Sequence, residues 1–283
     1  MTAIVISGKE LAKEKREKMK KEVAELKKKA IIPGLAVILV GEDPASQSYV
    51  KSKEKACKEI GIHSELDIVP DTISEQDLLQ KIDKLNNADH IHGILVQLPI
   101  PDHISEKAVI EAINPDKDVD GFHPINVGRM MIGQEGFLPC TPYGIVEMIK
   151  SKEIEISGKH VVVVGRSNIV GKPVGQLLLN ENATVTYCHS RTKNMMEYTK
   201  TADILVVAVG KAHFLNAEYI KEGAVVIDVG VNRNDEGKLV GDVDFEAAKE
   251  VASYITPVPG GVGPMTITML LHNTIVSAKR LMA

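Results

Sequence analysis

The sequence predicts an α/β protein of two domains, because apolar strand-like runs alternate with amphipathic helical stretches almost from end to end. The chain has 283 residues, of which 44% are hydrophobic, so it can bury one large or two medium cores. A Gly- and Pro-rich segment at 114–140 interrupts the alternation and is longer than a routine connection. We therefore expect two β-α-β series with mainly parallel sheets, and a functional loop or a boundary between them.

The first series begins with a helix near Ser7, which has capping-box spacing to Glu10. The helix should stop before Pro33-Gly34. The apolar run 35–41 then reads as a buried strand. The remaining elements of this series are a helix within 43–62, a strand at 64–69, a helix from Ser74 and a strand at 91–97.

The second series restarts with a helix, for which Thr141 is the expected N-cap and Pro142 the first helical residue. A helix is expected from about Gly171, and an amphipathic helix closes the chain. The expected strands are 159–165, 183–188, 203–210 and 223–230.

Composition excludes several classes of function. The 34 basic and 38 acidic residues leave a net charge of -4, which argues against nucleic-acid or membrane-surface binding by bulk charge. The longest apolar runs fall far short of the ~18 residues of a membrane span, and the N-terminus lacks a signal-peptide pattern. Three widely spaced cysteines indicate neither a disulfide framework nor a zinc site, and no histidine spacing indicates a metal. We expect a soluble protein of the reducing cytoplasm.

One lysine of the helix within 43–62 is out of place. On a helical wheel Lys53 falls at the centre of the apolar arc, whereas Lys51, Lys55 and Lys58 lie on the opposite, solvated side. A lysine directed at an apolar interior should have a lowered pKa, so that it can give and take protons. Tyr49, four residues earlier, should lie beside it. The wheel alone leaves open that Lys53 extends its ammonium group to water at the helix end.

Two further segments carry polar side chains that can act in chemistry. Gln97 ends the strand 91–97, where ligands of open α/β sheets gather, and its amide can bond a lysine without adding charge. Alternatively it makes an ordinary loop hydrogen bond. Asp118 and Asp120 precede Gly121. This pair of carboxylates could bind a metal ion or act as a general base, but the default interpretation for Asp next to Gly is that it forms a turn.

The strongest nucleotide signal is 161–175, a buried strand that passes through a glycine turn into a helix whose N-terminal amides can face an anion. Ser167 stands where the second glycine of a dinucleotide-binding pattern would be. The next strand ends in Ser190 and Arg191 rather than an acid, and with Arg166 these side chains suit a 2'-phosphate, which favours NADP. The alternative is a set of surface polar residues after an edge strand. The stretch 257–266, with three prolines and three glycines, either lets a flat ligand approach the backbone or is a rigid linker.

Together these segments resemble the bifunctional 5,10-methylenetetrahydrofolate dehydrogenase / 5,10-methenyltetrahydrofolate cyclohydrolase family. The match covers nearly the whole chain, in order. It rests on GEDPASQSYVKSK, GILVQLPIP, NPDKDVDGF, PCTPYG, VVVVGRSNIVGKPVG, ATVTYCHSRT, VIDVGVN and YITPVPGGVGPMT.

The resemblance implies a folate-binding catalytic domain (1–140 with 265–283), a Rossmann-like NADP-binding domain (141–264), a cleft between them that holds the folate, and a homodimer. It implies that Lys53 is the catalytic lysine of the cyclohydrolase step, that Tyr49 and Gln97 position and tune it, and that Asp120 holds the pterin ring. The implied folate contacts are Tyr49, Lys53, Val96, Gln97, Leu98, Asp120, Pro259, Gly260, Gly261 and Thr266. The expected NADP contacts are Thr141, Gly165, Arg166, Ser167, Ser190, Arg191 and Val231.

Two other functions fit parts of the sequence. An NADP-dependent dehydrogenase of a shikimate-type hydroxy acid needs a lysine-aspartate pair, which Lys53 and Asp120 could supply, although Gln97 and the stretch 257–266 argue against it. A non-catalytic nucleotide-sensing protein could keep the cofactor fold, but it has no use for a lysine on an apolar helix face.

Overall fold

The computed structural model describes residues 2–281, and they divide into two compact units. One unit contains residues up to 13 together with 141–266, and the other contains 14–140 together with 267 onward. The unit boundaries fall within α1 (Gly8–Lys28), after the first residue of α6 (Cys140–Lys150) and within α10 (Val262–Leu281). None of the helices described within residues 2–281 is long and apolar enough to cross a membrane.

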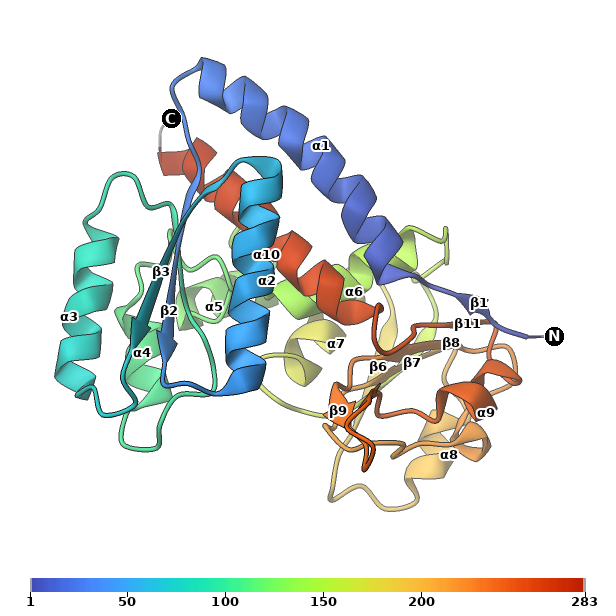
Figure 1. Cartoon of the computed structure of the whole chain (residues 1–283). Coiled ribbons are helices and arrows are strands. Elements are labelled where there is room, and N and C mark those ends of the chain that lie inside the picture. The colour runs from blue at the N-terminus through green and yellow to red at the C-terminus, as the bar shows by residue number, and fades with distance from the viewer. Residues whose placement is uncertain (1, 282–283) are drawn as a thin grey trace. The chain divides into compact units, whose positions relative to one another are not determined.

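The unit that contains 14–140 is built on a three-stranded parallel sheet in the order β3-β2-β4. Its central strand is buried along its whole length, as its continuous apolar sequence predicts. In Figure 1, α2 and α3 lie on opposite sides of β2 and β3. The strands are β2 (Gly34–Val40), β3 (His63–Val69) and β4 (Gly93–Val96), and the helices between and after them are α2 (Pro44–Ile60), α3 (Glu75–Asn86) and α4 (Glu106–Ala112).

Local capping signals explain where these helices begin and end. Asp43 accepts a hydrogen bond from the Ser46 amide at 2.7 Å, and Ser74 accepts one from the Asp77 amide at 3.1 Å, so each satisfies an N-terminal amide. Gly61 ends α2 in the left-handed conformation that glycine adopts at no steric cost. The Ser7 hydroxyl likewise accepts from the Glu10 amide at 3.2 Å, which confirms the helix start predicted there.

The segment 114–140 is more ordered than its composition predicts, because it contains α5 (Pro124–Met131). The Asn273 side chain of α10 donates to the carbonyl oxygens of Val119 and Leu138, at 2.9 and 3.1 Å. These bonds satisfy backbone acceptors of an irregular segment. The segment therefore depends on a residue more than 130 positions away, which its local sequence does not reveal.

The unit that contains 141–266 has a six-stranded sheet in the order β1-β11-β8-β7-β5-β6, and all its pairs are parallel. One core cluster joins alternate residues of its central strands, among them Val162, Val164, Leu205, Val207 and Val226. The strands are β1 (Ile4–Val5), β5 (His160–Val164), β6 (Thr184–Cys188), β7 (Ile204–Val207), β8 (Val225–Asp228) and β11 (Tyr254–Ile255), with an antiparallel pair β9 (Asn232–Arg233) and β10 (Leu239–Val240).

The helical elements of this unit include α6 (Cys140–Lys150), α7 (Gly171–Asn180), α8 (Met195–Thr199), η1 (Ala217–Tyr219) and α9 (Phe245–Lys249). Helix α6 begins at Cys140, so Thr141 lies in its first turn and is not the N-cap that the sequence predicts. Residues up to 13 group with this unit rather than with 14–140, because β1 pairs with β11. The NADP-domain bounds expected from the resemblance, 141–264, leave this first segment out.

Candidate functional site

Lys53 is the misplaced lysine that the helical wheel predicts. It lies on the buried face of α2 with Val50, Ala56 and Cys57, and only 4% of its surface is exposed. Lys51, Lys55 and Lys58 of the same helix are all exposed. The predicted division of the lysines is confirmed. Lys53 does not extend to solvent at the helix end.

The Lys53 side-chain nitrogen lies beside an amide and an aromatic ring. Its Nζ donates to Gln97 Oε1 at 3.0 Å and lies 4.7 Å from the centroid of the Tyr49 ring. Gln97 is held in turn by its own amide, because Nε2 donates to the Leu98 carbonyl oxygen at 2.7 Å. Gln97 directly follows β4, and its backbone amide bonds Ile38 of β2. The site therefore lies at the carboxyl end of the parallel sheet, as predicted.

The surroundings of Lys53 suit proton transfer. Burial lowers the pKa of Lys53, and the nearby Asp120 partly offsets this effect by favouring the ammonium form. Burial also raises the pKa of Asp120, while the charge of Lys53 and a hydrogen bond from the Cys140 thiol lower it. A lysine with a lowered pKa, next to an uncharged amide, gives and takes protons more readily than an exposed lysine does.

Asp118 and Asp120, two residues apart, have different surroundings. Asp118 is buried and accepts hydrogen bonds from the backbone amides of Phe122 and His123 and from the Asn126 side chain. Burial raises its pKa to about 6 despite these donors. Asp118 is thus the turn former expected before Gly121, whereas Asp120 is the carboxylate beside Lys53. With Val96, Leu98 and Ile94, Asp120 also lines a cavity of about 20 Å³.

A second site lies at the carboxyl ends of β5 and β7 in the other unit. The chain leaves β5 toward β6 on one side and returns to β7 on the other, so these strands form the switch point where open sheets bind ligands. A pocket of about 310 Å³ opens there. Its lining includes the predicted residues Gly165, Arg166, Ser167 and Ser190, together with Val164, His189, Met195, Ala208, Val209, Lys211 and Phe214.

The turn after β5 requires glycine at two positions. Gly165 has φ of +133°, and a Cβ there would lie 2.3 Å from the Ala208 carbonyl oxygen. A Cβ on Gly171 would lie 2.6 Å from the Gly165 carbonyl oxygen. Ser167 accepts from the amides of Val170 and Gly171, both at 3.2 Å, which leaves its hydroxyl proton for an anion. This turn fits the phosphates of a dinucleotide at the start of α7.

The sequence did not predict the aspartate that holds one loop of this pocket. Asp242 is fully buried and accepts from the backbone amides of Val209, Gly210 and Lys211 at 2.6 to 2.9 Å, and from the Asn232 side chain at 2.9 Å. It therefore fixes the loop that contributes Val209 and Lys211 to the pocket. The sequence signal was an aspartate after Gly241, but the backbone amides that it binds lie about 30 residues away.

Other predicted contacts lie outside the lining of this pocket. Arg191 and Val231 are exposed, Val231 to 65%. The Thr141 hydroxyl lies 2.9 Å from the Thr266 hydroxyl, at the starts of α6 and α10. Pro259, Gly260 and Gly261 belong to the same unit, and the Gly260 carbonyl accepts from the Lys9 amide at 3.0 Å. The stretch 257–261 is therefore tied to α1.

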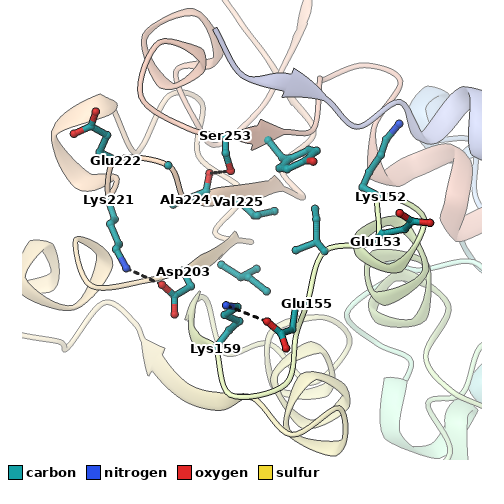
Figure 2. Close-up of a pocket in the computed structure, with 14 residues that line it drawn as sticks. Lys152, Glu153, Glu155, Lys159, Asp203, Lys221, Glu222, Ala224, Val225 and Ser253 are labelled. Atoms are coloured by element: carbon teal, nitrogen blue, oxygen red, sulfur yellow. Dashed lines mark hydrogen bonds and ion pairs between the residues drawn. The ribbon is translucent and has the colours of Figure 1, made fainter. Parts of the chain in front are cut away.

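Figure 2 shows another pocket, of about 390 Å³, at the amino ends of β5, β7, β8 and β11. Two of its three lysines are in ion pairs, because Lys221 pairs with Asp203 at 2.7 Å and Lys159 with Glu155 at 3.4 Å. Ligands of parallel sheets bind at the opposite, carboxyl ends. We assign no ligand to this pocket.

Comparison with known proteins agrees with this division into two sites. The catalytic-domain model of tetrahydrofolate dehydrogenase/cyclohydrolase matches residues 6–120, and the NAD(P)-binding-domain model matches residues 139–282. The Bifunctional protein FolD of Bacillus anthracis is 70% identical over 280 residues, which cover 99% of this chain and 98% of the relative.

Solved structures are similar over the same length. The bifunctional enzyme FolD (methylenetetrahydrofolate dehydrogenase/cyclohydrolase) from Campylobacter jejuni is 53% identical, with a TM-score of 0.97 and coverage of 98% of this chain and 99% of that one. The methylenetetrahydrofolate dehydrogenase-cyclohydrolase from Trypanosoma brucei, solved with NADP and an inhibitor, is 41% identical, with a TM-score of 0.95 and coverage of 99% and 98%.

Proposed function

Because the chain belongs to the tetrahydrofolate dehydrogenase/cyclohydrolase family, we propose roles for its residues in the two reactions of that family. The protein is a bifunctional enzyme of one-carbon metabolism. It oxidises 5,10-methylenetetrahydrofolate to 5,10-methenyltetrahydrofolate with NADP, and then hydrolyses the product to 10-formyltetrahydrofolate.

The first reaction needs alignment of two flat rings more than an acid or a base. When bound, NADP accepts the hydride that leaves the bridging methylene group. Gly165 would let the cofactor approach the backbone, and Ser167, Ser190 and Arg166 would hold its phosphates, with Ser190 and Arg166 as the candidates for the 2'-phosphate. Thr141 and Val231 stay predicted cofactor contacts on the resemblance alone, and Arg191 stays one because it follows the strand that ends at Cys188.

The second reaction moves protons, and Lys53 is the residue that moves them. Neutral Lys53 takes a proton from the water that adds to the methenyl carbon. The resulting ammonium returns that proton to the ring nitrogen as the carbon-nitrogen bond breaks, and the hydroxyl group on the carbon loses its own proton to solvent as the formyl carbonyl forms. The observation that carries this proposal is the buried Lys53, hydrogen-bonded at 3.0 Å to an uncharged amide.

The remaining residues near Lys53 position it and the substrate. Gln97 holds the lysine, and its amide adds no negative charge that would oppose the lowering of the Lys53 pKa by burial. Tyr49 packs its ring beside Nζ, and Asp120 binds the pterin ring. Val96 and Leu98 flank Gln97 and complete this group of contacts. Pro259, Gly260, Gly261 and Thr266 stay predicted folate contacts on the resemblance.

The direct test mixes the pure protein with methylenetetrahydrofolate and either NADP or NAD. Reduced cofactor and methenyltetrahydrofolate are followed separately, and 10-formyltetrahydrofolate is measured at the end. Both products should form with NADP. Turnover of shikimate with NADP, and none of the folate, would favour the hydroxy-acid alternative, whereas tight NADP binding without any turnover would favour a sensor.

We also propose that the protein is a homodimer in the cytoplasm. The dimer rests on the resemblance, and sedimentation of the purified protein at several concentrations tests it. The location rests on the composition and on three buried free cysteines, which suit a reducing compartment. Fractionation of cells that express the chain tests the location.

A further inference from the structure

Two histidines and a glutamate that take no part in the proposed reactions converge at one edge of the three-stranded sheet. Glu65 Oε1 lies 3.0 Å from His63 Nε2 and 2.9 Å from His90 Nε2. One nitrogen or oxygen of each residue lies within 4.8 Å of the other two. The imidazole rings meet edge to face, with centroids 5.9 Å apart. One carboxylate oxygen thus faces both imidazole nitrogens.

The backbone fixes this arrangement. His63 and Glu65 are two residues apart on the edge strand β3, so their side chains leave the same face. His90 lies in the connection before β4, and that connection packs on Gly34, the register partner of His63. A Cβ on Gly34 would lie 2.0 Å from the His90 carbonyl oxygen, so a larger residue would push the connection away.

A neighbouring histidine anchors the same connection. The Gly34 amide donates to His92 Nδ1 at 3.0 Å, and the His92 amide donates to the Gly34 carbonyl oxygen at 2.8 Å. His92 is buried, and its ring is held by this bond to β2. The position of His90 relative to His63 and Glu65 is therefore set by strand register and buried hydrogen bonds rather than by the exposed side chains.

We propose that His63, Glu65 and His90 bind one divalent transition-metal ion, with Zn²⁺ as the physiological ion. Two imidazoles and a carboxylate form a donor set that suits zinc, and not the oxygen-only shells of magnesium or calcium. Zinc-ligand bonds of ~2.0–2.2 Å place neighbouring tetrahedral ligand atoms ~3.3 Å apart, so the two short contacts need to open by only a few tenths of an ångström.

The site is open to water. The side chains of His63, Glu65 and His90 are 46%, 43% and 62% exposed. Water therefore completes the coordination of the ion. The bound ion replaces two N–H···O hydrogen bonds with three metal bonds, and it ties the edge strand β3 to the connection before β4 across β2.

This site is separate from Lys53. His63 pairs with Gly34 at the amino end of β2, whereas the Gln97 amide bonds Ile38, four residues further along the same strand. At ~3.3 Å per residue this is a separation of about 13 Å along the sheet. The ion should therefore stabilise the sheet without entering either reaction.

The test is a titration of the chelator-treated protein with Zn²⁺ by calorimetry, repeated with Co²⁺ to record its visible spectrum. The protein should bind one Zn²⁺ per chain, give a tetrahedral Co²⁺ spectrum and unfold at a higher temperature with Zn²⁺. His63→Asn, His90→Asn and Glu65→Gln should each weaken binding by about 100-fold or more, since even residues behind the ligands contribute 10–100-fold.

Asp67→Asn is the matched control, because Asp67 lies on the same strand two residues after Glu65 and pairs with Lys81 at 2.8 Å. It should bind Zn²⁺ as the native protein does. The absence of a stoichiometric Zn²⁺ site in the native protein, or equal binding by the His63→Asn/His90→Asn double variant, would overturn the proposal and leave an adventitious ion only. Loss of enzymatic activity in zinc-free native protein would contradict the structural role.

Discussion

Gln97→Glu tests the electrostatic part of the lysine proposal. The substitution places a carboxylate where Gln97 Oε1 now accepts from Lys53 Nζ at 3.0 Å. Two unit charges at this distance attract by about 5 kcal/mol at an effective dielectric constant of ~20. At ~1.4 kcal/mol per pKa unit this is an upper bound of about four units on the rise in the Lys53 pKa.

Asp120 already favours the ammonium form of Lys53 in the native protein, so the added carboxylate should raise the Lys53 pKa by less than this bound. Neutral Lys53 is the base in our proposal, so the cyclohydrolase rate rises with pH through the Lys53 pKa. That rise should start well below the ordinary lysine value of ~10.4 in the native enzyme. In Gln97→Glu the rise should move to higher pH, with a cyclohydrolase rate about 10-fold or more lower near neutral pH.

The assay follows the decay of methenyltetrahydrofolate across pH, with the rate in the absence of enzyme subtracted. Gln97→Met is the matched control, because it removes the amide without adding charge and should not move the pH dependence upward. Hydride transfer to NADP should keep its pH dependence in both variants. An unchanged pH dependence in Gln97→Glu, or the same change in Gln97→Met, would refute the electrostatic reasoning.

The cofactor site gives three further predictions. Gly165→Ala should weaken NADP binding and lower the unfolding temperature, because its Cβ would collide with the Ala208 carbonyl oxygen. Gly158→Ala is the control for backbone strain, since Gly158 has a positive φ of +73° but its Cβ would meet open space. Calorimetry measures NADP binding, and thermal unfolding measures the stability of both variants. Arg166→Ala should raise the KM for NADP by about 10- to 100-fold, which is the range for the loss of a charge-assisted hydrogen bond. The KM for NAD should stay nearly unchanged. An equal rise for both cofactors would show that Arg166 does not discriminate the 2'-phosphate. Asp242→Ala should release the 209–211 loop and weaken NADP binding by about tenfold or more. The hydrolysis of added methenyltetrahydrofolate should continue in this variant. NADP affinity equal to that of the native protein would contradict the positioning role of Asp242.

Local patterns in the sequence predicted the elements that local chemistry determines. Helix geometry placed Lys53 on the apolar face of α2, although it left open that the side chain extends to water, and the starts of α2 and α3 follow from side-chain caps within four residues. Part of the cofactor pocket was predicted, namely the glycine turn after β5 and the residues after β6. These two segments lie side by side because β5 and β6 are adjacent parallel strands, whose carboxyl ends lie at the same edge of the sheet. The resemblance then supplied the substrate, which no pattern of apolar residues can specify.

Long-range contacts explain what the sequence did not predict. Helix α5 depends on Asp118 and Asn126, which pair inside a buried turn, and on Asn273 of α10, which bonds the flanking backbone. The convergence of His63 and His90 depends on strand register across 27 residues. Propensity and spacing within a short window contain neither kind of information.

The central claim is that Lys53 serves one of the two reactions, and Lys53→Met tests it most directly. The variant is given methylenetetrahydrofolate and NADP, and reduced cofactor and methenyltetrahydrofolate are followed as separate signals. Lys55→Met is the matched control, because Lys55 lies on the exposed face of the same helix. We predict that methenyltetrahydrofolate accumulates with reduced cofactor in Lys53→Met, with hydrolysis slowed by about 10²- to 10⁴-fold, and that Lys55→Met behaves as the native enzyme does. Equal loss of both activities with folate binding intact would contradict the account.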